Sequence, residues 1–198
     1  MSLFGGKSRQ LVGLDIGSSS IKAVELKATK GGYELVSFGT EHLAPDTVVD
    51  GAIMDAPQVA NAISKIFDSQ RIKTKNVATS VSGHSVIVKR VPLPLMTEEE
   101  LYDRIPSEAS QHIPFDIADV NLSYQLLESM DSQMDVLLVA VKKDKILNHT
   151  NVLAQAGKTP VVVGAHRRCG GARGEQRYRF RTSQRAVAPD HRFCTHNH

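Results

Sequence analysis

The sequence predicts a mixed α/β fold of the α+β type, in which short strands alternate with a few amphipathic helices. Strand-like alternation of apolar and polar residues recurs along the chain, and separate stretches carry apolar residues at helical spacing. Of the 198 residues, 41% are apolar, which is enough for a buried core. The longest apolar runs fall far short of the roughly 20 residues of a membrane span. Residues 1–10 lack the apolar segment of a signal peptide, and two cysteines exclude a disulfide scaffold.

The N-terminal part predicts three strands joined by tight turns. Leu11–Leu14 is apolar, Ile21–Lys27 alternates apolar and charged residues, and Tyr33–Phe38 resumes the alternation after Gly31-Gly32. Short turns between such segments indicate an antiparallel meander.

A helix and a fourth main strand should follow the meander. Asp55 is a suitable N-cap, with Pro57 in the first turn. One apolar stripe then follows at helical spacing, formed by Val59, Ile63, Ile66 and Phe67. Val77–Ser82 is a short buried strand that ends at Gly83. The first unit is therefore β-β-β-α-β.

A second unit with the pattern β-α-β-β-α-β is expected over residues 84–163. Its first strand is His84–Val91, which Pro92 and Pro94 should stop, and Thr97 with Glu100 forms a capping box before a helix that Pro106 should kink or end. The remaining expected elements are strands Val120–Leu127 and Asp135–Lys142, a helix Asp144–Ala156 capped by Gly157, and a strand Pro160–Val163. The run Lys142–Lys145 is interpreted as a solvated helix entry.

The most informative motif is the small, hydroxyl-rich turn Asp15-Ile-Gly-Ser-Ser-Ser-Ile-Lys22 between the first two strands. Such a turn lets backbone N–H groups approach a phosphate, and the serines add donors. The candidate nucleotide-binding residues are Asp15, Gly17, Ser18, Ser19, Ser20 and Lys22, and Asp15 is expected to bind Mg²⁺ through water. The alternative is a plain β-hairpin with an Asp-x-Gly turn.

The motif and three further segments resemble the actin-like ATPases, and among them the PilM-type proteins of type IV pilus assembly and, next, the FtsA-type proteins of cell division. The segments are Leu11–Leu26, Val91–Pro94, Gln111–Ile117 and Val120–Leu127. The resemblance covers roughly residues 8–163.

The resemblance implies a ribonuclease H-like lobe over residues 8–83, bearing the phosphate-1 loop, and an inserted subdomain of the SHS2 type over residues 84–163. It implies binding of ATP with Mg²⁺, and docking of the N-terminal cytoplasmic peptide of the inner-membrane protein PilN between the two subdomains. The expected docking region includes Val81, Ser82, Gly83, Ser85 and Val86, with the helix after Thr97 as its second wall. A non-catalytic scaffold is expected in the cytoplasm, held at the inner face of the membrane only through PilN and other pilus assembly proteins of the inner membrane.

The sequence also departs from the actin-like pattern. A second Asp-x-Gly turn and the glycine pair of an adenosine-binding helix are missing, so the second lobe is expected to be absent and ATP binding by this chain to be weak. The alternatives are an FtsA-like division protein and a fragment of a sugar or acetate kinase of the same superfamily.

Residues 164–198 differ in composition from the rest of the chain. They contain eight arginines, no lysine, both cysteines (Cys169 and Cys194) and four of the eight histidines. Three interpretations remain: a basic nucleic-acid-binding tail, a metal site, or a stretch read out of frame. The third is preferred, so no nucleic-acid partner is expected, and the tail is expected to be disordered and dispensable.

Overall fold

The computed structural model describes residues 10–130, 132–167 and 176–181. The strands are β1 (Val12–Ile16), β2 (Ser20–Thr29), β3 (Gly32–His42), β4 (Val48–Val49), β5 (Ala52–Ile53), β6 (Asn76–Val81), β7 (Val86–Pro94), β8 (Val120–Met130), β9 (Gln133–Lys142), β10 (Thr159–Arg167) and β11 (Gln176–Arg181). The helices are α1 (Ala56–Ser69), α2 (Glu98–His112), α3 (Lys143–Gln155) and the short 3₁₀ helix η1 (Ile117–Asp119). The predicted α/β class is confirmed.

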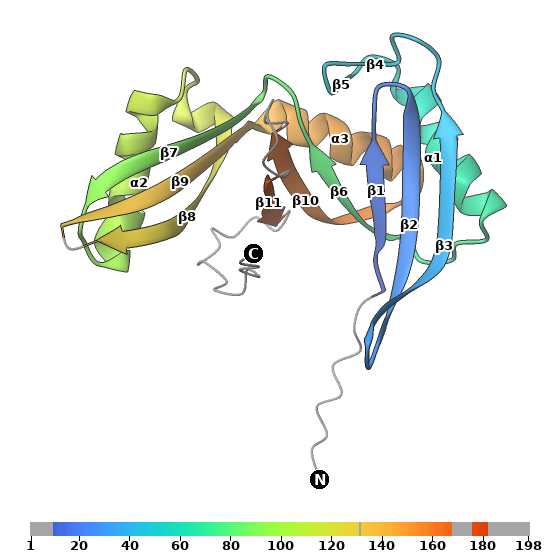
Figure 1. Cartoon of the computed structure of the whole chain (residues 1–198). Coiled ribbons are helices and arrows are strands. Elements are labelled where there is room, and N and C mark those ends of the chain that lie inside the picture. Colours follow the sequence, from blue (N-terminus) through green and yellow to red (C-terminus); the bar gives the residue numbers. More distant parts are fainter. Residues whose placement is uncertain (1–9, 131, 168–175, 182–198) are drawn as a thin grey trace.

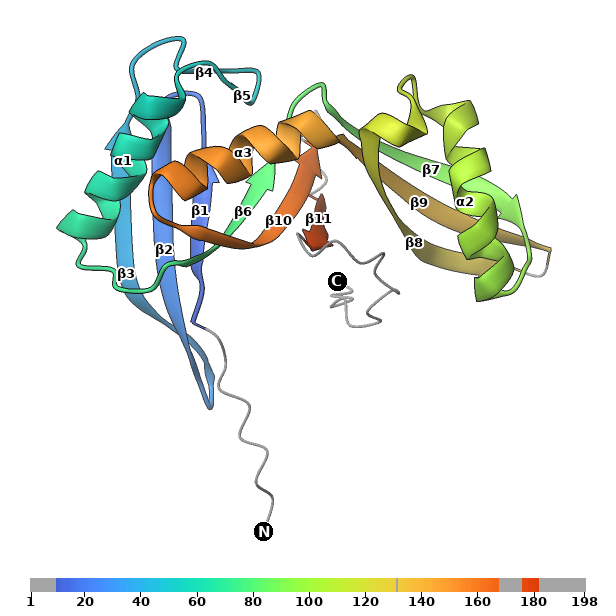
Figure 2. The ribbon, with the colours of Figure 1, turned by 180° about the vertical axis from the view of Figure 1, so that it is seen from behind.

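A six-stranded sheet forms the larger part of the molecule, with the order β11-β10-β6-β1-β2-β3 (Figure 1). Strands β1, β2 and β3 form the predicted antiparallel meander, whereas β1, β6 and β10 run parallel to one another. Helices α1 and α3 cover the same face of this sheet (Figure 2). Parallel neighbours need crossover connections, and the two helices lie on these crossovers.

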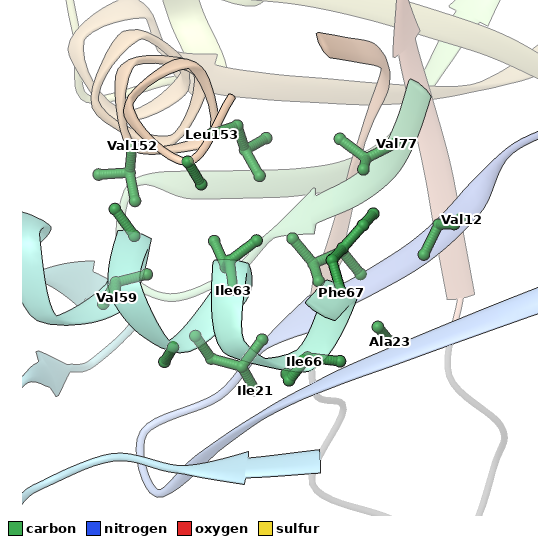
Figure 3. Close-up of a cluster of buried hydrophobic side chains, with 14 of the residues drawn as sticks. Val12, Ile21, Ala23, Val59, Ile63, Ile66, Phe67, Val77, Val152 and Leu153 are labelled. Carbon is green, nitrogen blue, oxygen red and sulfur yellow. The ribbon is translucent and has the colours of Figure 1, made fainter. Parts of the chain in front are cut away.

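The core lies between the sheet and the two helices (Figure 3). The side chain of Asp55 accepts a hydrogen bond from the Gln58 N–H at 2.9 Å, so α1 begins as predicted. The predicted stripe of α1 is buried against residues of β1, β2, β6 and α3. The main contributors are Val12, Ile21, Val59, Ile63, Ile66, Phe67, Val77, Val152 and Leu153.

A three-stranded sheet with the order β7-β9-β8 forms the smaller part, and α2 packs on one of its faces. The capping box at the start of α2 is confirmed, because the Thr97 N–H donates to Glu100 Oε2 at 2.8 Å and Thr97 Oγ1 accepts from the Glu100 N–H at 3.3 Å. Burial of Leu101, Ile105 and Ala109 fixes this helix on the sheet.

Pro92 acts differently from the prediction, whereas β7 ends at Pro94 as predicted. Strand β7 continues through Pro92 to Pro94 because it pairs only with β9 and is an edge strand, where a missing N–H can point outward. Helix α2 continues through Pro106 to His112. Ile105 and Ala109 on either side of this proline are buried, so packing offsets the lost backbone hydrogen bond.

The two sheets divide the chain differently from the expected boundary between residues 8–83 and 84–163. Strand β10 belongs to the six-stranded sheet and helix α3 packs on that sheet. The second unit therefore extends only from β7 to β9. The reason is burial: Val163 and Ala165 of β10 are buried where this strand pairs in parallel with β6.

The expectation of a tail without regular structure from residue 164 onward is wrong for part of the segment. Strand β10 continues to Arg167, and β11 pairs with it in antiparallel orientation. The signal in the sequence is the alternation of Tyr178 and Phe180 with arginines, which is typical of a strand. Cys169 and Cys194 lie outside the described residues, and within the described ranges no group of three or more His, Cys, Asp and Glu residues is placed to hold a metal.

Candidate functional site

Strands β1, β6 and β10 end at the same edge of the six-stranded sheet because they run parallel. Ligands of open α/β sheets bind at the carboxyl ends of such strands. The β1–β2 turn, the β4–β5 turn, the β6–β7 connection and the start of α3 all lie along this edge (Figure 1). The predicted phosphate turn therefore lies where ligands of this kind of sheet bind.

The β1–β2 turn is tight and anchored at both ends. The Gly17 N–H donates to Ser20 O at 3.0 Å, and the Leu43 N–H after β3 donates to Ser19 O at 2.9 Å. A Cβ at Gly17 would lie 3.0 Å from Ser20 O, so this closure favours glycine. Ser18 and Ser19 are exposed, while Ser20 is buried at the start of β2. Two of the three predicted serines thus face solvent, where they can donate to a ligand.

Asp15 and Lys22 stand opposite each other just below the turn. They are register partners, with Lys22 Nζ 3.6 Å from Asp15 Oδ2 and each side chain about half exposed. A half-exposed ion pair contributes little to stability, so both groups remain available to a ligand. The structure therefore brings the predicted carboxylate, lysine and serines together around one turn, an arrangement that suits a phosphate and a hydrated cation.

A second feature of this edge joins the β6–β7 connection to the β4–β5 turn. Gly83 has a φ of +97°, and a Cβ on it would lie 2.2 Å from Asp50 O. Asp50 and Gly51 also have positive φ, and Lys145 Nζ of α3 donates to Gly51 O. The two connections and the helix are therefore interlocked where the two sheets meet.

Lys145 and His149 lie one helical turn apart on α3, and both are buried, with 7% and 3% of their surface exposed. Burial lowers the pKa of Lys145, and burial together with the positive charge of Lys145 lowers the pKa of His149 to about 4. His149 Nδ1 lies 3.2 Å from Lys145 O. For Lys145 the predicted solvated helix entry is wrong, because the packing of α3 on the sheet places this lysine inside.

The predicted docking residues divide into two groups. Val81 and Val86 are buried in a cluster between the two sheets, so their side chains do not form an open surface. Ser82, Gly83 and Ser85 are at least partly exposed. Sequence reasoning placed the region at the junction, but it could not separate the residues that close the junction from those that face solvent.

Helix α2 is not the second wall of this region. It packs on the face of the three-stranded sheet formed by Val136, Leu138 and Ala140, whereas Val139 and Val141 point to the opposite face, toward β6 and β10. Successive residues of a strand alternate between faces, so α2 and the junction lie on opposite sides of β9. The face of β7 and β9 that carries Val139 is the face that borders this region.

The face of β7 and β9 that carries Val139, here called the inner face, becomes polar beyond the buried cluster. Val88 of β7 packs against the cluster and is partly exposed, and Arg90 two residues further along binds Asp135 of β9, with its Nε 2.9 Å from Asp135 Oδ2. An accessible surface with an apolar part and a charged part therefore borders the junction.

The sheet order β3-β2-β1-β6-β10, with an α+β subdomain inserted between β6 and β10, is that of one lobe of an actin-like protein. The chain belongs to the type IV pilus assembly protein PilM family, whose sequence pattern it matches over residues 13–167.

Two solved structures are similar to the chain. The PilM–PilN type IV pilus biogenesis complex is matched with 25% identity and a TM-score of 0.69, over 78% of this chain and 46% of the other chain. The chain thus spans about half the length of that relative. The cytoplasmic domain of EpsL, an inner-membrane component of the type II secretion system of Vibrio cholerae, is matched with 15% identity and a TM-score of 0.49, over 78% and 56% of the two chains.

Within the part of the chain that the structure describes, none of the helices has the length and apolar character needed to cross a membrane.

Proposed function

We propose that this protein is a non-catalytic scaffold of type IV pilus assembly that binds the N-terminal cytoplasmic segment of PilN at the junction of its two sheets. The family supports the assembly role, and the similarity to a PilM–PilN complex supports the partner. The proposal places the protein in the cytoplasm, where PilN and other inner-membrane assembly proteins would hold it at the membrane.

The surface that carries this proposal borders Ser82–Ser85 and the inner face of β7 and β9. It combines the partly exposed Val88 with the Arg90–Asp135 pair, beside a buried apolar cluster. Extended peptides bind such sites through a few apolar anchors and backbone hydrogen bonds. A division-protein or kinase role has no comparable support in the observed site.

We expect a synthetic peptide of the PilN N-terminal segment to bind this chain, and Ser85→Trp to weaken the binding at least tenfold. The indole would occupy the partly exposed position of Ser85, whose backbone carbonyl keeps its hydrogen bond from the Lys142 N–H. Fluorescence anisotropy measures the affinity, and thermal melting checks that the variant is folded.

Ser107→Trp is the matched control, because Ser107 is exposed on α2, on the opposite side of the sheet. Equal weakening by both substitutions, or no binding to the unaltered chain, would contradict the proposed docking region.

We also propose that the β1–β2 turn forms the phosphate-contacting half of an ATP–Mg²⁺ site. The exposed hydroxyls of Ser18 and Ser19 and the accessible pair of Lys22 with Asp15 fit a phosphate and a hydrated cation. Bound ATP would order the lobe and would act as a ligand of a non-catalytic scaffold.

The lobe that the structure describes would contact the phosphates from one side, so we expect Mg²⁺–ATP to bind this chain only in the millimolar range. We expect NMR amide shifts at Gly17–Ser20 on titration, smaller shifts in Lys22→Gln, and unchanged shifts in Lys27→Gln, which alters an exposed lysine further along β2. The hairpin turn at Gly31-Gly32 should not respond. Micromolar affinity, or shifts spread equally over both turns, would contradict this assignment.

A further inference from the structure

Strand β10 has two edges, and they are paired differently. Its inner edge pairs with β6 over Thr159–Ala165, and its outer edge pairs with β11 over Val162–Arg167. Without β11, that outer edge would present a row of unpaired backbone N–H and C=O groups. Such an edge is a template for another strand.

This outer edge lies at the junction of the two sheets. Val163 and Ala165 of β10 are fully buried in the cluster that also contains Val86, Val139 and Val141 of the three-stranded sheet. Figures 1 and 2 both place β11 at the end of the six-stranded sheet that is nearest to the three-stranded sheet. A strand added to β10 therefore runs beside the proposed docking region.

We propose that the outer edge of β10 is a strand-addition site for an extended peptide of a partner, and that β11 is a segment of the chain itself that fills this site. The site spans six residues of β10, from Val162 to Arg167. Backbone pairing supplies the affinity, and side chains at alternate positions supply the preference.

The register indicates the chemistry of the peptide. Positions opposite Val163 and Ala165, whose side chains are buried, should favour apolar residues, and the positions between them should tolerate polar ones. The segment that occupies the edge follows this rule in its sequence, with Phe180 and Tyr178 at the two apolar positions and three arginines and Gln176 at the others. An extended segment with apolar residues at every second position is thus the expected ligand.

Because β11 fills this edge, β11 would compete with such a peptide. A peptide that pairs with β10 must first displace β11, so its apparent affinity falls by the fraction of molecules in which the edge is open. This competition, unlike the strand-addition site itself, rests on the proposed binding of the PilN segment at the junction.

The test uses the full chain and a variant with two adjacent prolines, Tyr178→Pro with Arg179→Pro. Successive residues of an antiparallel strand direct their N–H groups to opposite sides, so one of the two prolines removes a hydrogen bond to β10. The readout is hydrogen exchange of the Val162–Arg167 amides that face away from β6. We expect exchange at least about tenfold faster in the variant. Ser183→Pro with Gln184→Pro, just beyond β11, should leave it unchanged.

A synthetic peptide of residues 174–183, added to the Tyr178→Pro, Arg179→Pro variant, should restore protection of the same amides, whereas a scrambled peptide should not. Unchanged exchange in the variant, or equal effects of the two peptides, would overturn the strand-addition site. This arm does not depend on PilN.

The PilN N-terminal peptide should bind the double-proline variant at least threefold more tightly than the unaltered chain. Equal affinities would overturn the competition. Binding to neither protein would overturn the proposed function, while the arm with residues 174–183 still decides the strand-addition site.

Discussion

Replacing Gly83 with alanine should lower the free energy of unfolding by about 3 kcal/mol. The backbone φ of +97° costs an L-residue about 1–2 kcal/mol, and the new Cβ would lie 2.2 Å from Asp50 O. Asp50 O belongs to the backbone of the β4–β5 turn, where the neighbouring Gly51 O accepts a hydrogen bond from the buried Lys145. The collision can therefore be relieved only if this turn moves. Urea unfolding monitored by circular dichroism measures the change.

Gly157→Ala is the matched control for this prediction. Gly157 also has a positive φ, +69°, but a Cβ there would meet no atom within 4 Å. Its substitution should cost only the conformational part, about 1 kcal/mol. If the two substitutions cost the same, the contact between the β6–β7 connection and the β4–β5 turn does not stabilise the junction.

Lowering the pH from 7.5 to 5 should remove about 2 kcal/mol of stability through His149 alone. Its pKa is about 4 in the folded protein and about 6.5 when unfolded, so between these values only the unfolded state takes up the proton. The stability that the neutral, buried ring contributes is complete above pH 6.5 and is lost as the pH falls toward 4. Urea unfolding at both pH values measures the loss.

Carboxylates also titrate in this range, so the comparison is with His149→Gln, in which the change between pH 7.5 and 5 should be about 2 kcal/mol smaller. His84→Gln replaces an exposed histidine and should behave like the unaltered protein. An identical pH dependence of the His149→Gln variant would show that the buried position of α3 does not control this titration.

The β1–β2 turn illustrates what local sequence can predict. Asp15, the glycine and serines of the turn, and Lys22 lie within eight residues, and a tight hairpin leaves them few ways to be arranged. The helix after Asp55 and the capping box at Thr97 are equally local, because an N-cap acts on N–H groups two or three residues away. These predictions needed no knowledge of distant neighbours.

Pro92 of β7, the position of α3 and the two faces of β9 illustrate what local sequence could not predict. Whether Pro92 ends a strand depends on whether that strand has one neighbour or two, and whether Lys145 is solvated depends on the surface on which α3 packs.

The sequence by itself determined the α/β class, the meander with its tight β1–β2 turn, the caps of α1 and α2, and the resemblance to the actin-like proteins, since all of these depend on residues close together in the chain. The tertiary structure alone decided that α3 and β10 return to the first sheet, that Val81 and Val86 close the junction, and that β11 covers the outer edge of β10. These outcomes depend on pairing and burial between segments that lie far apart, for which many partners are compatible with the same local pattern.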